Sequence, residues 1–374
     1  MNGFLIYKIE TKGKIKKLVC ILILISIILG TINTAASFQA NNVDKNISNE
    51  AIVKNKSSYD KKYAVIIVGS YGFANAYQTI DQIDENRTKY YKWYLNSAQS
   101  IYNVLKDKYS FDEQNIFTLI TKNKNYKLPD GFNKSIIKYP SDKSHIEKVF
   151  KTFEEGSSNE LNENDLLFVV FIDHGLDGHL LLNYLIKKLF KIDMPKIDGE
   201  YAHNTAFVLE PKLNLIFRDI LNYDFTKTRL VFTNIMLLDY QFAKYLKGIK
   251  ARVVALQPCY SGGYINDLSA GNRIICTASG ENELAFLSWI GPFTRALNGT
   301  IGTDYNSDGN ISILEAYRYA AEDVEKQISR NPTQGPDHPL IDDNGDKIGY
   351  HFNDSGYDPS IPGKDGYLAA NTFL

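Results

Sequence analysis

The chain alternates short, continuously apolar runs with longer stretches in which apolar positions recur at helical spacing. Two runs, 166–172 and 251–256, are rich in β-branched residues and carry almost no charge. Runs of this kind are typical of strands that are buried on both faces, as in a parallel sheet. Similar runs at 63–69, 116–120 and 273–278 predict further strands.

Helical patterns lie between these runs and cover 89–108, 144–153, 235–246 and 314–328. Strands that alternate with helices predict an α/β fold with a mostly parallel sheet flanked by helices, in three layers. The stretch 177–234 is longer than one crossover helix requires, and we interpret it as an insertion near the rim of the sheet. A lid, a substrate platform and an activation loop are all compatible with it.

A histidine and a cysteine follow the two most apolar runs, and glycines come close behind each of them. His174 is followed by Gly175, and Cys259 precedes the pair Gly262 and Gly263. Ligands bind at the carboxyl ends of parallel strands, so these side chains are candidates for a general base and a nucleophile. His179 is a rival base that lies further from the strand end. The other histidines are predicted to be surface residues: His145, His203, His338 and His351.

Three segments resemble the legumain (asparaginyl endopeptidase) family of caspase-like cysteine peptidases. They are Asp-His-Gly-x-x-Gly at 173–178, Pro-Cys-Tyr-Ser-Gly-Gly at 258–263 and Arg-Ile-Ile-Cys-Thr-Ala-Ser at 273–279. The similarity is interrupted and extends over 63–278. It implies a caspase-like fold, a dyad of His174 and Cys259, and cleavage of peptide bonds.

The expected chemistry begins at the thiol, which has a pKa of about 8.5 when free. An imidazole beside it favours the thiolate, which attacks a peptide carbonyl and forms a thioester. The ring then donates a proton to the departing amine and later activates water. The backbone N–H groups of Gly175 and Cys259 are the expected donors to the oxyanion, as the resemblance also suggests.

The specificity pocket is where the chain departs from the family. The family carries an Arg–His pair before the first helix and an acidic residue two positions before the nucleophile. The corresponding stretch 92–97 lacks that pair, and Gln257 stands at the acidic position. Ser279, Glu281 and Glu283 are further candidate substrate-binding residues; the two glutamates either line a pocket for a basic side chain or belong to a solvated loop. We expect a polar or charged residue before the scissile bond.

Residues 304–315 match the loop of an EF-hand. Its oxygen-bearing residues fall at the expected ligand positions, with a glycine, Gly309, at the sharp turn. They are Asp304, Asn306, Asp308, Asn310, Ser312 and Glu315. We predict a structural Ca²⁺ here and no cofactor for catalysis. The stretch 342–346 repeats the pattern only in part, because it lacks the closing glutamate.

The amino terminus has the layout of a secretory signal. Five lysines precede an apolar run at 18–30, which is short for a membrane-spanning helix, and Thr34-Ala35-Ala36 supplies small residues for cleavage. We therefore expect a signal peptide over 1–36. The alternative is an uncleaved signal anchor, which would be the only part of the chain expected to contact a membrane. A disordered leader is predicted for 37–60.

Length, charge and cysteine content limit the remaining possibilities. The chain has 374 residues. Beyond the signal and the leader, we expect a peptidase domain over 61–290 and a carboxyl-terminal extension over 291–374. The net charge of −1 gives no electrostatic reason to expect nucleic acid as a partner. Three cysteines are too few for a disulfide scaffold, and Cys276 is expected to be a buried, inert thiol. The leading prediction is a secreted or cell-envelope endopeptidase that acts on peptides or proteins. A transpeptidase and a catalytically silent calcium-binding module are the alternatives.

Overall fold

The computed structural model describes residues 59–69, 80–120, 128–177, 205–208, 236–249, 252–285, 288–332 and 337–374. All of them fall within one compact unit of the chain. The predicted signal, the predicted leader up to residue 58, His179, His203 and most of the 177–234 insertion lie outside the described residues.

Ten strands and seven α-helices are assigned in the described residues. The strands are β1 (Lys62–Val68), β2 (Ile116–Ile120), β3 (Ile137–Tyr139), β4 (Leu166–Ile172), β5 (Gly175–Asp177), β6 (Thr205–Val208), β7 (Met236–Leu238), β8 (Val253–Leu256), β9 (Ile274–Thr277) and β10 (Leu340–Asp342). The helices are α2 (Ile80–Asn103), α3 (Lys143–Lys151), α6 (Asp239–Tyr245), α7 (Ile265–Leu268), α8 (Ile290–Leu297), α9 (Ile313–Arg330) and α10 (Tyr367–Ala370). A π-helical turn at Val104–Lys108 extends α2, and short 3₁₀ turns occur at Glu113–Asn115, Lys134–Ile136 and Ser261–Tyr264.

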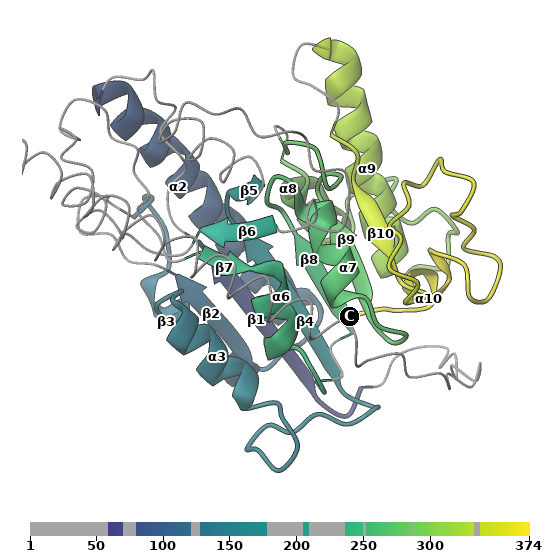
Figure 1. Ribbon diagram of the computed structural model, residues 1–374, viewed down its shortest axis with the longest axis horizontal. Helices are drawn as coiled ribbons and strands as arrows, with labels where there is room; N and C mark the ends of the chain where they lie inside the picture. Colours follow the sequence, from purple (N-terminus) through teal and green to yellow (C-terminus); the bar gives the residue numbers. More distant parts are fainter. Residues whose placement is uncertain are drawn as a thin grey trace, which may run out of the picture. The chain divides into compact units, whose positions relative to one another are not determined.

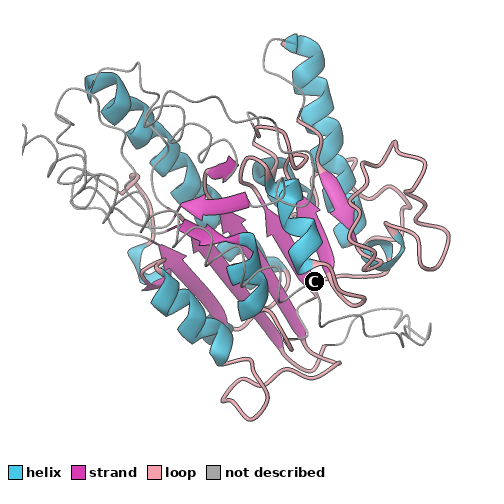
Figure 2. Ribbon diagram, viewed as in Figure 1, coloured by secondary structure: helices cyan, strands magenta, loops and turns pink. Residues whose placement is uncertain are grey.

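A mostly parallel sheet forms the centre of the unit. Its seven strands follow the order β10-β9-β8-β4-β1-β2-β3, and only β10 runs antiparallel to its neighbour (Figures 1 and 2). The central strand β4 pairs with β1 on one side and with β8 on the other. All seven of its side chains are buried, as its uninterrupted apolar sequence predicts.

Helices cover both faces of this sheet, so the fold has three layers, as predicted (Figure 1). Alternate side chains of each strand point to opposite faces. On one face, Phe168 belongs to the core formed with α2, α8 and α9. On the other face, Phe171 packs with α3, α6 and α7. The broad class of the fold is therefore confirmed.

A second, three-stranded antiparallel sheet follows the end of β4. Its order is β5-β6-β7, and β5 begins at Gly175, directly after the candidate base. The prediction of one helix over 235–246 was wrong in its first turn, because Met236–Leu238 pairs with β6 and the helix begins only at Asp239. A strand partner supplied by distant residues overrides the local helical pattern there.

Candidate active site

The strands that carry His174 and Cys259 are direct neighbours. β4 and β8 run parallel, with Phe171 opposite Leu256, so both strands end at the same edge of the sheet. His174 follows the end of β4 and Cys259 follows the end of β8. The sheet therefore brings the candidate base and the candidate nucleophile to one edge, as predicted from the two apolar runs.

The backbone of Gly175 packs directly against the backbone of Cys259. A methyl group built on Gly175 would overlap the carbonyl oxygen of Cys259 and lie 3.0 Å from its nitrogen. Only glycine fits without a shift of one chain, since the obstacle is backbone and not a flexible side chain. The close approach places the residue that follows the candidate base in contact with the candidate nucleophile.

The Cys259 thiol is half-buried at this junction, and its sulfur lies 3.8 Å from the carbonyl oxygen of Ala285. Burial raises the pKa of the thiol, while backbone hydrogen bonds involving Ala285, Gly175 and Cys259 itself lower it. The backbone of Gly175, which carries one of the two N–H groups expected to bind an oxyanion, thus lies close to Cys259.

The turn after the thiol is held in an uncommon conformation. Tyr260 has φ 59° and ψ 20°, the left-handed region that bulky residues rarely adopt. Its N–H donates to the Glu283 carbonyl oxygen at 2.7 Å, and the 3₁₀ turn Ser261–Tyr264 starts at once. A strained residue of this kind persists only where its surroundings fix it, and such residues cluster at functional sites.

The His174 ring lies against the first layer of helices. The ring meets the Tyr94 ring of α2 edge to face, with 5.5 Å between ring centres, and the backbone N–H of His174 donates to Asp173 Oδ1 at 2.7 Å. Burial lowers the pKa of His174 to about 4. The ring is therefore neutral at neutral pH and able to accept a proton. Because the thiol pKa is raised, the two groups rest as neutral imidazole and neutral thiol, without the thiolate expected from the sequence.

The segment after β9 is fastened to the turn that carries Cys259. The Ser261 hydroxyl accepts from the N–H groups of Ala278 and Ser279 at 3.1 and 3.3 Å. A methyl group on Gly262 would lie 2.6 Å from the nitrogen of Glu281. Ser279, Glu281 and Glu283 thus belong to a segment that contacts the turn after the candidate nucleophile.

The predicted pocket residues differ in how exposed they are. Gln257 is 4% exposed, and its side-chain oxygen accepts from the Ile290 N–H at 2.7 Å, which ties the end of β8 to the start of α8. The Ser279 hydroxyl is fully buried and has no hydrogen-bond partner among the described residues. Glu281 is partly exposed. Their roles in substrate binding stay predictions.

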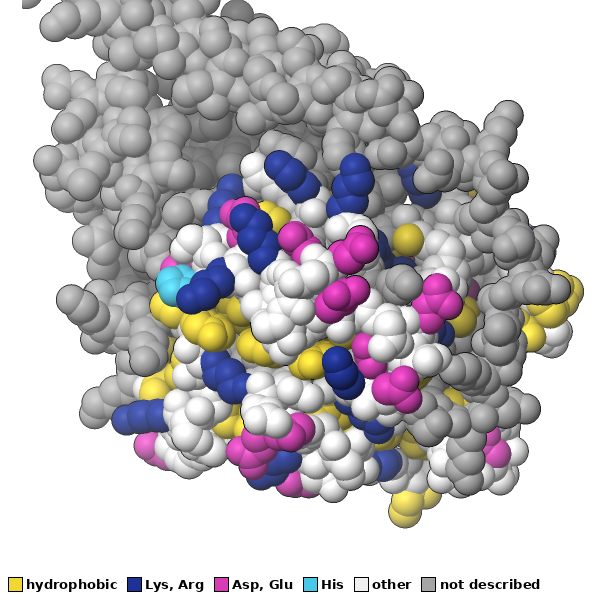
Figure 3. Space-filling view, turned by 90° about the horizontal axis from the view of Figure 1, so that it is seen from below, with side chains coloured by type: hydrophobic (Ala, Val, Ile, Leu, Met, Phe, Trp, Pro, Cys, Tyr) yellow, Lys and Arg dark blue, Asp and Glu magenta, His cyan; other side chains and the backbone are white. Residues whose placement is uncertain are grey.

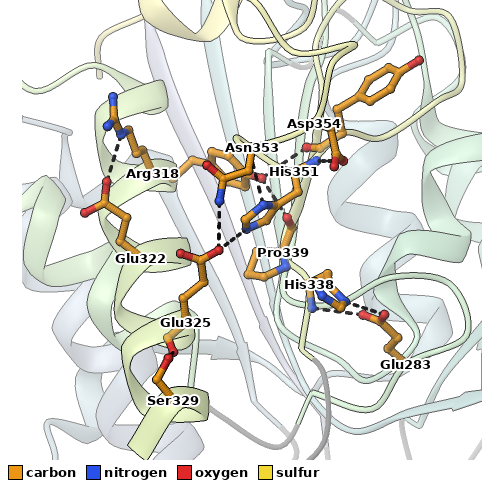
Figure 4. Close-up of polar contacts among 12 residues, drawn as sticks. Glu283, Arg318, Glu322, Glu325, Ser329, His338, Pro339, His351, Asn353 and Asp354 are labelled. Atoms are coloured by element: carbon orange, nitrogen blue, oxygen red, sulfur yellow. Dashed lines mark hydrogen bonds and ion pairs between the residues drawn. The ribbon is translucent and has the colours of Figure 1, made fainter.

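Glu283 is held by a segment that no sequence pattern connects with it. Its carboxylate accepts from the backbone N–H groups of Gly280 and His338 at 3.1 and 3.0 Å, and it contacts His338 Nδ1 at 2.6 Å (Figure 4). The neighbouring Asp337 is 2% exposed, and its charge adds to the raised pKa of Cys259. The residues before β10 therefore border the site, although neither had been singled out.

The surface assignment of His351 was wrong. This residue is 6% exposed, its ring centre lies 6.2 Å from that of His338, and its Nε2 lies 3.7 Å from Glu325 Oε1 on α9. Figure 4 shows the two histidines between Glu283 and Glu325. Burial lowers the pKa of His351. Contacts with residues distant in the chain bury His351, and no local sequence pattern predicts these contacts. Cys276, by contrast, is fully buried as predicted.

The predicted calcium loop has the backbone that its sequence requires. Gly309 adopts φ 83°, which glycine tolerates at the sharp turn. Both oxygens of Glu315 accept N–H groups, one from Tyr305 at 2.9 Å and the other from Ser312 at 2.8 Å, so the last ligand position faces the first part of the loop. Ser312 and Glu315 also form a capping box that starts α9. Across the described ranges, no three His, Cys, Asp or Glu side chains already stand together as a metal-binding group.

Comparison with known proteins adds no assignment. The chain matches no protein-family model, and no curated protein matches it. Among the described helices, none is both long enough and apolar enough to cross a membrane.

Proposed function

We propose that this chain is an exported cysteine endopeptidase with a caspase-like fold, related to the legumain family, in which Cys259 is the nucleophile and His174 the base. One observation carries the proposal. The backbone of Gly175 packs on the backbone of Cys259 at the shared edge of β4 and β8, so the chain leaving the histidine touches the chain that holds the thiol. His174 and Cys259, which adjoin this contact, are the base and the nucleophile that peptide cleavage by a thiol requires.

The protonation states favour proton transfer at the moment of attack. The neutral His174 ring accepts the thiol proton as the sulfur adds to the peptide carbonyl. Collapse of the tetrahedral intermediate forms a thioester on Cys259, and the imidazolium gives its proton to the departing amine. Water, deprotonated by the same ring, then releases the acid and restores the thiol.

The developing negative charge on the carbonyl oxygen needs donors that are already in place. The N–H groups of Gly175 and Cys259 have this role in the proposal, because the two backbones are in direct contact. Their positions are fixed by the strand pairing of β4 with β8 and by the close contact at Gly175. No side-chain donor is required.

The residue before the scissile bond is proposed to be polar or charged. The Glu283 carboxylate accepts from the backbone N–H groups of Gly280 and His338 and contacts His338 Nδ1, so its role is to support the loop. A basic peptide side chain is expected to meet the partly exposed Glu281. Basic and acidic side chains are interspersed on the face drawn in Figure 3, so the described residues of that face form no uniformly basic patch for nucleic acid.

The 304–315 loop is proposed to bind one structural Ca²⁺. Its residues fit the ion, since the loop supplies carboxylate and amide oxygens, which calcium prefers, and carries a glycine with positive φ at the turn. Asp304, Asn306, Asp308 and Glu315 would hold the ion, with Asn310 and Ser312 completing the set. Bound calcium supplies rigidity at the start of α9, and the dyad performs the chemistry.

The proposal is tested by Cys259→Ala, assayed against a peptide library with the purified protein. We expect cleavage to fall to background while circular dichroism stays unchanged. Cys276→Ala is the matched control, since it removes a buried thiol of the same chain away from the dyad and should keep most of the activity. Undiminished cleavage by Cys259→Ala would end the proposal.

A transpeptidase is the second candidate, because an amine can resolve the thioester in place of water. Mass spectrometry of products formed with an added amine separates it from a hydrolase. A catalytically silent calcium-binding module is the third candidate. In that case the wild type should leave the peptide library uncleaved, and His174→Ala should not change the rate at which a thiol-directed electrophile labels Cys259.

A further inference from the structure

A second loop repeats the geometry of the predicted calcium loop. In 304–310, the side chain of Asn306 accepts from the Asp308 N–H at 2.9 Å, and the Asp308 side chain accepts from the Asn310 N–H at 2.8 Å. In 342–348, Asn344 accepts from the Asp346 N–H at 2.8 Å, and Asp346 accepts from the Ile348 N–H at 2.8 Å. The two loops thus share one hydrogen-bond pattern.

The backbones agree as well. The fourth and sixth residues of the first loop, Ser307 and Gly309, have φ of 60° and 83°. The corresponding residues of the second loop, Gly345 and Lys347, have φ of 83° and 72°. A lysine in the left-handed region is uncommon, so this conformation is imposed by the loop. The likeness of shape alone does not establish a ligand.

Buried carboxylate oxygens give the independent observation. Asp342 opens the second loop and is 0% exposed, and its Oδ2 has no hydrogen-bond partner among the described residues. Asp365, also 0% exposed, contributes a second such oxygen, its own Oδ2. A buried carboxylate without a partner is costly unless a proton or a metal ion neutralises it. Asp342 precedes Asp343 in the chain, and Asp365 accepts from the Asp343 N–H at 2.9 Å, so the two oxygens belong to one buried cluster. This cluster points to a cation.

Asp365 comes from outside the loop and reaches it through the backbone. Its other oxygen, Oδ1, accepts from the Asp343 N–H at 2.9 Å, and its charge interacts with those of Asp342 and Asp346. It therefore occupies the role of the closing glutamate that the second loop lacks. The sequence alone could not supply this residue, because the loop and Asp365 are joined only in the folded chain.

Arg273, the buried basic residue near this cluster, donates hydrogen bonds to backbone carbonyls outside it. The buried guanidinium of Arg273 interacts electrostatically with Asp342. Its N–H groups, however, donate to the backbone carbonyls of Leu246, Ile249 and Leu268. None of these three hydrogen bonds reaches the acidic cluster, so a divalent cation would have to offset the charge of its carboxylates.

We propose that Asp342, Asn344 and Asp346, together with the distant Asp365, form a second divalent-cation site of the Ca²⁺ class. The ligand set is oxygen only, as calcium prefers. Because these side chains do not yet form a complete shell, the ion draws the two unpartnered oxygens toward itself. Asp343 stays outside the shell and accepts from the Gly366 and Ala369 N–H groups at 2.9 and 2.7 Å. The ion therefore fastens the carboxyl-terminal segment to the end of β10.

The test is a calorimetric titration of Ca²⁺ into the purified protein after removal of metal by a chelator. We expect two sites in the wild type. Asp308→Asn should remove the first, while Asp346→Asn and Asp365→Asn should each weaken the second at least about tenfold. Asp346 is exposed, so its variant is expected to fold even if the buried Asp365→Asn does not.

Asp130→Asn, an exposed position remote from both loops in the sequence, is the charge-matched control and should bind like the wild type. If Asp346→Asn and Asp365→Asn both titrate like this control, the second site is refuted. A wild type that binds only one Ca²⁺, at a site lost in Asp308→Asn, would also refute the second site. Neither result depends on peptide cleavage, so the fate of the peptidase proposal is judged separately.

Discussion

At the scale of single residues, Gly175 determines whether the two halves of the site can meet. Its Cα faces the main chain of Cys259, and any side chain would push the two strand ends apart. The neutral His174 ring and the neutral thiol are also properties of single residues, since each follows mainly from the burial of one side chain. Two predictions belong to this scale.

Gly175→Ala should damage both stability and activity. The added methyl group overlaps backbone, so strand β5 or the Cys259 turn must move, at a cost of about 1–3 kcal/mol. We expect a lower melting temperature and a loss of peptide cleavage of at least about tenfold. Gly291→Ala in α8 is the matched control, because its nearest obstacle is only the Ser288 side chain at 3.0 Å. Equal behaviour of the two variants would show that the contact at Gly175 is unimportant.

The pH dependence of cleavage follows from the buried imidazole. His174 has a pKa of about 4, so it loses its ability to accept a proton only as the pH falls through that value. We expect kcat/KM to stay level from neutral pH down to about pH 5 and to decline near pH 4. An acid limb near the ordinary histidine pKa of about 6.5 would mean that the ring is solvated in the working enzyme.

At the scale of elements, the site is assembled by loops that the sheet places side by side. The segments after β4, β8 and β9 meet the segment before β10, and the contact of Glu283 with His338 joins the last two. The Glu283 carbonyl oxygen also accepts the N–H of Tyr260, next to the nucleophile. The contact between Glu283 and His338 therefore holds the loop beside the thiol in place, and we call this contact the clamp.

Glu283→Gln should loosen that clamp. The amide accepts more weakly than a carboxylate from the two N–H groups and from His338, with an expected loss of about 1–3 kcal/mol. We expect faster labelling of Cys259 by a small thiol reagent and slower cleavage of peptides, since the loop no longer holds one position. Glu281→Gln is the matched control for stability and labelling; a labelling rate equal to that of the control would contradict the clamp.

At the scale of the whole molecule, the central sheet keeps chemistry and stabilising elements apart. His174 and Cys259 lie where β4 and β8 end, whereas both acidic loops belong to the carboxyl-terminal part of the chain, around α9 and β10. The first loop caps α9 through Ser312 and Glu315, and the second joins β10 to the segment that leads into α10. A cation in either loop would therefore stabilise the carboxyl-terminal part of the chain and take no part in the proposed reaction.

The sequence by itself determined the features that depend on neighbours in the chain. Uninterrupted apolar runs identified β4 and β8, glycines after His174 and Cys259 pointed to close backbone approach, and regular spacing identified the 304–315 loop. The tertiary structure alone decided which distant residues join them. Tyr94, His338 and Asp365 reach their places through strand order and helix packing, and β7 replaced part of a predicted helix because β6 offered it a partner. Local patterns record which face of an element is buried, but not which other element will cover it.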